Sequence, residues 1–204
     1  MTSFAAPQAW AAKAARPTPF RIPNEFYPTP PEATRALLSV ETFDGPVWEP
    51  ACGDGRIAKV LTDHGLAVVA TDLHAYGVGD TGIDFLRERT ARAKHIVTNP
   101  PYGRGLADQF VDHALALTRD TGGKVAMLLN MASLCHPQRT SSWQRQPPAR
   151  IYAVDDIVCW PEDRYGQPPA YFTKHRYCWA VWTHDHVSGF LSAILAMWPA
   201  LKSR

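Results

Sequence analysis

Short apolar runs alternate with amphipathic stretches between residues 46 and 131, and this alternation constrains the fold of the chain most. Runs typical of buried strands lie near 46–50, 66–71, 79–83, 94–98 and 123–131. Between them we expect helices near 55–64, 85–92 and 105–119, and in the last of these Leu106, Phe110, Ala114 and Leu117 face one way. Strands that alternate with helices form a parallel sheet with helices on both faces. We therefore predict an α/β fold with a doubly wound, mostly parallel sheet.

The pattern extends on both sides of this region. Thr29-Pro30-Pro31-Glu32 has the residues of a helix start, in which Thr29 caps the first turn and Glu32 completes a capping box. Further on, 151–160 and 176–183 predict two more strands, and 187–201 predicts a closing amphipathic helix. Residues 1–24 contain four prolines and three basic residues without an acidic one, so we expect a flexible basic arm. Residues 25–204 then form a single domain.

The first candidate site is the tetrapeptide Asn99-Pro100-Pro101-Tyr102, which directly follows the predicted strand 94–98. Two consecutive prolines remove two backbone donors, and Pro100 favours an extended conformation for Asn99. The result is a rigid turn that presents an amide, whose carbonyl accepts hydrogen bonds from an amino group. The phenol ring of Tyr102 can stack on a planar base. The tetrapeptide therefore suits a planar substrate with an NH2 group, and an ordinary proline-rich turn is the alternative.

The second candidate site is the segment Val47–Ile57, which reads as a short strand, a glycine turn and a helix start. Gly53 and Gly55 permit a tight turn and a close approach of the backbone to a ligand. The next predicted strand ends at Asp72, where a carboxylate can bind ribose hydroxyls, as in dinucleotide-binding folds. A glycine turn in this context indicates a nucleotide-like cofactor.

Three motifs, taken in order, resemble those of the small, phage-like S-adenosylmethionine-dependent N6-adenine DNA methyltransferases. They are Tyr27-Pro28-Thr29-Pro30, the glycine turn 49–55 and the NPPY motif 99–102. The resemblance extends over residues 26–183. It implies a class I methyltransferase (Rossmann-like) fold with a seven-stranded sheet and one antiparallel strand, and it implies S-adenosylmethionine as the cofactor.

The resemblance also implies roles for single residues. Asn99 and Pro100 would accept the two amino hydrogens of adenine through their oxygens, Pro101 belongs to the same catalytic turn, and Tyr102 would stack on the base once it leaves the duplex. Asp84 and Phe85 would bind the cofactor adenine, with a helix cap as the alternative role of Asp84. The cofactor set that the resemblance implies is Tyr27, Thr29, Glu49, Ala51, Gly53, Gly55, Asp72, Leu73, Asp84, Phe85 and Asn99.

Two segments without regular patterning, 136–150 and 161–175, combine basic and aromatic side chains. Such combinations suit a groove that follows phosphates and stacks bases, so we expect contact with DNA, although loops packed by their own rings are the alternative. The larger members of the family carry a long target-recognition domain, for which this chain has no room, so we expect little sequence discrimination. The candidate nucleic-acid-binding residues are Arg139, Trp143, Arg145, Arg164 and Lys174.

Composition restricts the remaining possibilities. No apolar run reaches the length of about 18 residues that a transmembrane helix needs, so no membrane partner is expected. The four cysteines show no CxxC spacing, so we expect no metal site and reduced thiols in a cytoplasmic protein.

Alternative functions share parts of this pattern. Adenine methylation of RNA stays open, as does methylation of a glutamine amide in a protein, because that amide also presents a planar NH2 group. A nicotinamide oxidoreductase would share the sheet, but its GxGxxG is absent because Ile57 and Ala58 follow Arg56. A non-catalytic binding module is disfavoured by the intact Asn99.

Overall fold

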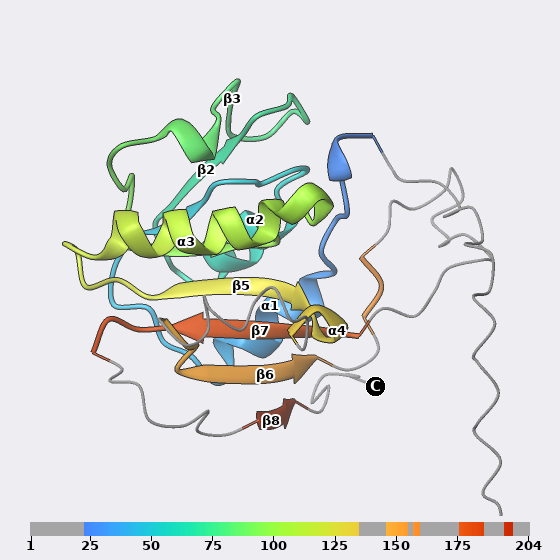
Figure 1. Cartoon of the computed structure of the whole chain (residues 1–204). Coiled ribbons are helices and arrows are strands. Elements are labelled where there is room, and N and C mark those ends of the chain that lie inside the picture. The colour runs from blue at the N-terminus through green and yellow to red at the C-terminus, as the bar shows by residue number, and fades with distance from the viewer. Residues whose placement is uncertain (1–22, 135–145, 155–156, 160–175, 186–193, 198–204) are drawn as a thin grey trace, which may run out of the picture.

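An eight-stranded sheet organises the chain in the computed structural model, which describes residues 23–134, 146–154, 157–159, 176–185 and 194–197. The strand order is β3-β2-β1-β4-β5-β7-β6-β8, as Figure 1 shows for most of the sheet. β7 runs antiparallel to β5 and β6, and the other described pairs are parallel. The predicted mostly parallel sheet with one antiparallel strand is confirmed, with eight strands in the described residues instead of the seven expected. The strands are β1 (Val47–Glu49), β2 (Val68–Asp72), β3 (Asp80–Thr81), β4 (His95–Thr98), β5 (Val125–Asn130), β6 (Arg150–Val154), β7 (Tyr177–Trp182) and β8 (Ile194–Met197).

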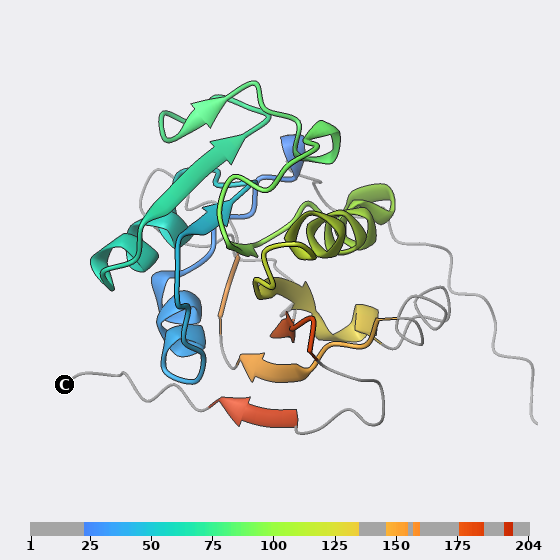
Figure 2. The same ribbon diagram turned by 90° about the vertical axis from the view of Figure 1, so that its left-hand side faces the viewer.

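Helices cover both faces of the sheet. Figure 2 shows α1 (Pro31–Leu38) and α2 (Arg56–Asp63) on one face and α3 (Leu106–Thr118) on the other. Each face has its own buried cluster, around Leu61 and Trp179 on the first and around Trp48 and Phe110 on the second. The sheet is therefore doubly wound, as predicted. The shorter elements are α4 (Met131–Leu134) and the 3-10 turns η1 (Pro23–Glu25), η2 (Phe85–Arg87) and η3 (Gly103–Gly105).

The start of α1 differs from the predicted capping box. The N-cap is Pro30, one residue later than predicted, and no side chain caps the helix. The N–H of Ala33 donates to the carbonyl oxygen of Pro30 at 3.0 Å. The first turn of the helix is therefore closed on Pro30 and not on Thr29. The helix is held instead by tertiary contacts, among them a 2.8 Å hydrogen bond from Trp179 Nε1 to the Ala33 carbonyl oxygen.

The helix predicted over 85–92 is a single 3-10 turn, η2. Asp84 caps this turn through a 3.1 Å bond from Leu86 N to Oδ1, which is the alternative role considered for Asp84. Glu88 is already extended, with φ −65° and ψ 140°. Phe85 is the one residue of this segment that is buried, so no apolar stripe exists to support a longer helix.

The closing helix predicted over 187–201 is corrected by the structure, because residues 194–197 form strand β8. This strand pairs in parallel with β6, with Ile151 opposite Ile194. β6 would otherwise be an edge strand with unpaired backbone groups, and an added strand satisfies them. The rest of 187–201 lies outside the described residues, as do residues 1–22 of the predicted arm. None of the helices in the described part has the length and apolar character needed to span a membrane.

Candidate active site

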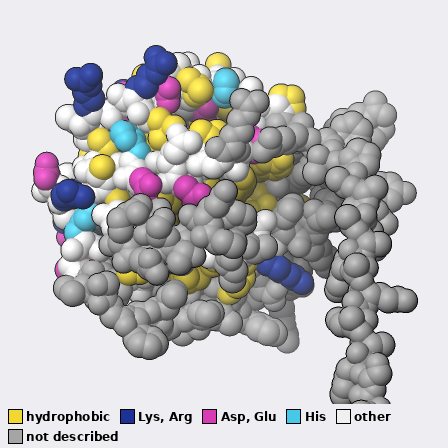
Figure 3. Space-filling view, viewed as in Figure 1, with side chains coloured by type: hydrophobic (Ala, Val, Ile, Leu, Met, Phe, Trp, Pro, Cys, Tyr) yellow, Lys and Arg dark blue, Asp and Glu magenta, His cyan; other side chains and the backbone are white. Residues whose placement is uncertain are grey.

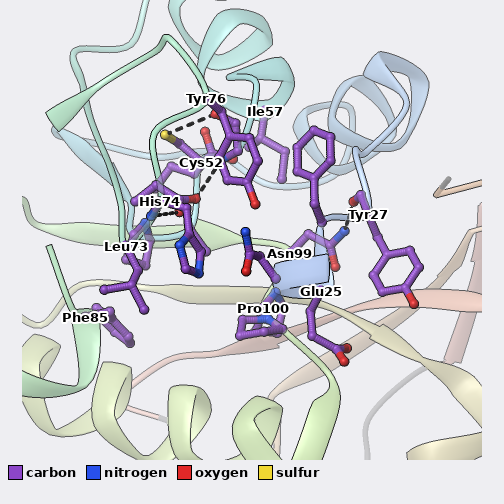
Figure 4. Close-up of a pocket in the computed structure, with 18 of the residues that line it drawn as sticks. Glu25, Tyr27, Cys52, Ile57, Leu73, His74, Tyr76, Phe85, Asn99 and Pro100 are labelled. Carbon is purple, nitrogen blue, oxygen red and sulfur yellow. Dashed lines mark hydrogen bonds between the residues drawn. The ribbon is translucent and has the colours of Figure 1, made fainter. Parts of the chain in front are cut away.

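The carboxyl ends of β1, β2 and β4 lie at one edge of the sheet, and the residues there surround a cavity of about 260 Å³. Glu49 ends β1, Asp72 ends β2, and Asn99 follows β4. Figure 4 shows Asn99 and Pro100 on the side of the N-terminal segment, across the cavity from Cys52, Leu73 and His74. Open α/β sheets bind their ligands at this edge.

Most of the site residues predicted from the sequence line this cavity. They are Tyr27, Thr29, Glu49, Ala51, Gly53, Asp72, Leu73, Asp84, Phe85, Asn99, Pro100 and Pro101. Gly55 and Tyr102 lie close by but are not part of the lining. The predicted nucleic-acid contacts fall outside the described residues. These are Arg139, Trp143, Arg145, Arg164 and Lys174, together with all of insertion 161–175 and most of 136–150.

The glycine turn is held against its neighbours by close packing. Gly53 has a φ of 53°, and a Cβ added to it would come within 2.9 Å of Phe26 Cε2. Gly55 caps α2 with a φ of 79°, and a Cβ there would meet Val78 Cγ1 at 2.7 Å. Both positions therefore exclude a side chain. Gly55 shapes the turn, whereas Gly53 faces the cavity.

Glu49 is a buried carboxyl at the start of α2. Its side chain is 1% exposed, and Oε2 accepts a 2.7 Å hydrogen bond from Ala58 N in the first turn of the helix. Burial raises the pKa of Glu49 well above its usual range, and nearby Asp54 and Asp72 raise it further, whereas the bond from Ala58 opposes this. The group is a poorly solvated acceptor at the floor of the cavity.

Asp72 connects two loops through its carboxylate. Oδ2 accepts a bond from Gly53 N at 2.9 Å, and Oδ1 accepts one from His74 N at 2.8 Å. A carboxylate oxygen can accept more than one hydrogen bond, so each oxygen retains acceptor capacity. Asp72 thus sets the position of the glycine turn and can still bind hydroxyl groups.

The amide of Asn99 is held on both sides. Nδ2 donates to the Tyr27 carbonyl oxygen at 2.9 Å and to Thr29 Oγ1 at 3.0 Å. Oδ1 accepts a hydrogen bond from the Tyr102 hydroxyl, which also lies 2.9 Å from the Leu128 carbonyl oxygen. The rigid turn predicted at Asn99 is therefore connected to the Tyr27–Thr29 segment, far away in the sequence.

The ring of Tyr102 lies near two other aromatic rings. It is half-buried, with its centroid 6.5 Å from that of Tyr27 and 6.4 Å from that of Tyr177. Stacking of Tyr102 on a target base stays a prediction.

The pair predicted to bind the cofactor adenine has structural partners as well. Asp84 caps η2, and its Oδ2 lies 3.2 Å from Arg87 Nε. Phe85 is 2% exposed and packs against Trp48 and Phe110, with ring centroids 5.2 and 4.7 Å away. Phe85 therefore contributes to the core and offers the cavity a small part of its surface.

Sequence reasoning missed one wall of the cavity. Phe26 stacks on Tyr76 with centroids 4.5 Å apart and an interplanar angle of 16°, and His74 meets Tyr76 edge to face. The sequence does carry a signal for this wall, because aromatic rings follow Asp72 at two alternate positions, His74 and Tyr76. Cys52 was not singled out either; burial raises the pKa of its thiol to about 12, and Sγ lies 3.6 Å from the Val78 carbonyl oxygen. This thiol is protonated and is not a nucleophile.

The lining is rich in carboxyl groups. The acidic side chains among the described lining residues are Glu25, Glu49, Asp54, Asp72 and Asp84. Arg56 is the one lysine or arginine among them, and its Nε is paired with Asp54 Oδ2 at 2.8 Å. Glu49 contributes less negative charge than the others because its pKa is raised, but the remaining carboxylates favour a ligand that carries positive charge.

Comparisons with known proteins identify the fold. No family model matches the chain, and no curated protein matches its sequence. A protein from Listeria monocytogenes assigned to the class I S-adenosylmethionine-dependent methyltransferases is similar in structure, with a TM-score of 0.58 and 11% identity over 86% of this chain and 67% of that one. A Pyrococcus horikoshii protein assigned as an RNA methyltransferase has a TM-score of 0.57 and 13% identity, over 77% of this chain and 86% of that one.

A third similar structure belongs to a larger protein. It is a modification subunit from Vibrio vulnificus assigned to a type I restriction enzyme, with a TM-score of 0.50 and 16% identity. The match covers 78% of this chain but 44% of that subunit. At identities between 11% and 16%, what these likenesses establish is the fold of the chain, which is that of the class I S-adenosylmethionine-dependent methyltransferases.

Proposed function

We propose that this protein transfers a methyl group from S-adenosylmethionine to the exocyclic N6 of adenine in DNA. The observation that carries the proposal is the Asn99 amide. It lies on a rigid Asn-Pro-Pro turn and lines the same cavity as the glycine turn and Asp72. A group that binds a planar amine and a loop that suits a nucleoside cofactor thus face each other.

The cavity fits the cofactor chemically. S-adenosylmethionine supplies a methyl group on a positively charged sulfur, together with an ammonium group, and the lining is rich in carboxyl groups. Asp72 retains acceptor capacity for ribose hydroxyls, and Gly53 lets the backbone approach closely. Leu73, which is 52% exposed, offers apolar surface beside Asp72 for the adenine ring.

The chain's own residues would position the amine. Asn99 Oδ1 and the Pro100 carbonyl would each accept one amino hydrogen, which directs the nitrogen lone pair out of conjugation with the ring. The lone pair forms the new nitrogen–carbon bond as the electrons of the sulfur–carbon bond move onto sulfur. The methylated nitrogen then releases one proton to water. The main contribution of the protein is positioning together with electrostatic stabilisation.

A nucleic acid is favoured over a protein amide as the substrate. The motif order resembles adenine methyltransferases, and the similar structures include a restriction-modification subunit and a protein assigned as an RNA methyltransferase. RNA stays the closest alternative substrate.

Replacement of Asn99 by alanine tests the proposal. We expect Asn99→Ala to lower methyl transfer on the order of 100-fold or more, the scale for loss of one transition-state hydrogen-bonding group. The measurement is transfer of a labelled methyl group to double-stranded DNA, single-stranded DNA, RNA and a protein mixture in parallel. S-adenosylhomocysteine should still bind the variant when measured by calorimetry.

A matched control removes an exposed amide elsewhere. Gln109 lies on α3 with its side chain in solvent, so Gln109→Ala should leave transfer unchanged. Full activity of Asn99→Ala would reduce Asn99 to a turn residue. Transfer confined to RNA or to protein would reassign the substrate.

A further inference from the structure

The hydrogens of the Asn99 amide are fully used. An asparagine NH2 group has two hydrogens, and here one points to the Tyr27 carbonyl oxygen at 2.9 Å and the other to Thr29 Oγ1 at 3.0 Å. Thr29 is 4% exposed, so this bond is shielded from water. Both acceptors belong to one short segment, which lies about 70 residues earlier in the sequence than Asn99.

These two acceptors determine which way the amide faces. A carbonyl oxygen can accept hydrogen bonds but cannot donate them, so the atom next to the Tyr27 oxygen has to be nitrogen. Rotation of the amide by half a turn would place Oδ1 against the Tyr27 oxygen and leave both N–H groups without these acceptors. Oδ1 is thereby directed away from the Tyr27–Thr29 segment. It accepts one bond from the Tyr102 hydroxyl and keeps a second lone pair.

We propose that Thr29 is a positioning residue for the reaction, which fixes the Asn99 amide so that Oδ1 is the atom offered to the substrate amine. The inference rests on the proposed function, because it assigns a role within the same site. It goes beyond contact with the cofactor, and it explains why a hydroxyl residue stands at this position although it does not cap α1.

The sequence around Thr29 supports such a role. Pro28, Pro30 and Pro31 have no backbone N–H, so these neighbours offer no donor that would compete for Thr29 Oγ1. The position of the segment is fixed from the other side by α1, which is attached to β7 through the bond from Trp179 Nε1 to Ala33. The amide of Asn99 therefore connects two segments that prolines stiffen, the Tyr27–Thr29 segment and the Asn-Pro-Pro turn. Neither segment needs to reorganise to keep the amide in place.

The first test compares variants of Thr29 in a methyl-transfer assay. Thr29→Val removes the hydroxyl at nearly constant shape, and Thr29→Ser keeps the hydroxyl while removing the methyl group. At saturating cofactor we expect a fall in kcat of roughly ten-fold for Thr29→Val, the scale for one lost hydrogen bond, and near wild-type kcat for Thr29→Ser. The affinity for S-adenosylhomocysteine, measured by calorimetry, should change by less than about two-fold for Thr29→Ser.

The chain offers a matched control. Thr34 is likewise a fully buried threonine, five positions further on in α1, and its Oγ1 has no hydrogen-bond partner among the described residues. Thr34→Val should leave kcat unchanged. A fall in kcat of the same size in Thr34→Val and Thr29→Val would overturn the proposal, because it would reveal a general effect of replacing a buried threonine in or next to α1. Thr29→Ala replaces Thr29→Val if the latter does not fold.

The second test needs no activity. The chain has three asparagines, so selective 15N labelling gives few side-chain amide signals, and Asn99→Ala identifies the one in question. In the wild type both Asn99 amide hydrogens should exchange slowly with water. In Thr29→Val one should exchange faster while the hydrogen on the Tyr27 oxygen stays protected, and Thr29→Ser should restore both.

The two tests separate the two proposals. Absence of methyl transfer by the wild-type protein to any substrate would remove the proposed function, and the amide signals would still report whether Thr29 holds Asn99. Transfer by the wild type with an unchanged kcat and unchanged Asn99 exchange in Thr29→Val would overturn the positioning role alone.

Discussion

Glu49 lines the cavity, but its burial makes the ionised form of its carboxyl group unfavourable for the stability of the fold. Its pKa is raised, chiefly by burial, so the folded state binds a proton more tightly than the unfolded chain does. Stability from this group is therefore fully present below the ordinary pKa of about 4.5 and is lost as the pH rises toward the folded value.

Replacement of Glu49 by glutamine should remove this loss. The amide oxygen of glutamine can still accept the bond from Ala58 N, so the start of α2 keeps its partner. We expect Glu49→Gln to be more stable than the wild type at neutral and higher pH, with a difference that shrinks in acid. Urea unfolding over a pH series measures this. A difference independent of pH would contradict it.

Tyr102 provides a second test at the scale of single residues. Its hydroxyl contacts Asn99 Oδ1 and the Leu128 carbonyl oxygen, and these contacts oppose an outward movement of the ring. If stacking on the target base requires that movement, Tyr102→Phe should raise kcat/KM by up to about ten-fold, the scale for one hydrogen bond, whereas Tyr102→Ala should lower it. Equal losses in both variants would show that the hydroxyl itself is needed.

The sequence predicts a site residue well where the motif that identifies it and the strand that positions it are adjacent in the chain. Gly53, Asp72 and Asn99 each follow a predicted strand, and they line the cavity. The contact of Thr29 with Asn99 could not be predicted, because it joins two segments that the fold alone brings together. The stack of Phe26 on Tyr76 escaped prediction for the same reason.

At the scale of elements, Glu41, in the segment after α1, is bonded to Lys124, the residue before β5, and to two residues of β6. It is 4% exposed and accepts bonds from Lys124 Nζ at 2.7 Å, from Tyr152 Oη at 2.7 Å and from the Arg150 guanidinium. Burial opposes ionisation, but the bonds from Arg150, Lys124 and Tyr152 outweigh it, so the pKa of Glu41 is lowered. Three segments far apart in the sequence thus meet at one carboxylate.

Loss of this carboxylate should destabilise the fold. We expect Glu41→Gln to reduce the free energy of unfolding at neutral pH by roughly 1.5–3 kcal/mol, the range for hydrogen bonds to a charged group. Because the folded pKa is lowered, the stabilisation is present above about 4.5 and is lost as the pH falls through the folded value. The variant and the wild type should therefore converge in acid. Urea unfolding of the variant and the wild type, at neutral pH and in acid, measures whether their stabilities converge.

The order of strands and helices along the chain was predictable, because strands that are buried on both faces appear in the sequence as apolar runs. The buried parallel strands β1, β4 and β5 are largely apolar runs, and they appear close to where the runs predict them. The errors have tertiary causes. The segment after Phe85 has no apolar stripe to bury, and residues 194–197 complete the hydrogen bonding of β6, which helical spacing cannot reveal.

At the scale of the whole molecule, charge restricts where a nucleic acid can lie. Figure 3 shows acidic side chains over α3, the helix that carries Asp108 and Asp112 and no lysine or arginine. The surface of α3 is therefore unfavourable for phosphates. Contact with DNA is expected instead from the basic and aromatic residues of 136–150 and 161–175, most of which lie outside the described residues.

Salt titration of DNA affinity tests this expectation. Arg145→Ala or Lys174→Ala should weaken binding similarly for all sequences and reduce the slope of affinity against salt by about one, as loss of one phosphate contact does. Trp143→Ala should cost roughly 1–3 kcal/mol if its ring stacks on a base. Lys59→Ala, on the exposed side of α2, serves as the control and should leave the slope unchanged. Unchanged slopes for Arg145 and Lys174 would remove these loops from the interface.

Both ends of the described sheet bear on self-association. The sheet finishes in β3, two exposed residues that include Asp80, and in β8, four residues laid along β6. Both borders are short, and β3 also carries the charge of Asp80, so they offer a neighbouring molecule few backbone groups on which to add a strand. Without β8, the five-residue border of β6, with Ile151, Tyr152 and Val154 buried, would be open to such growth. In the described sheet β8 therefore covers the border of β6 and leaves a shorter edge in its place.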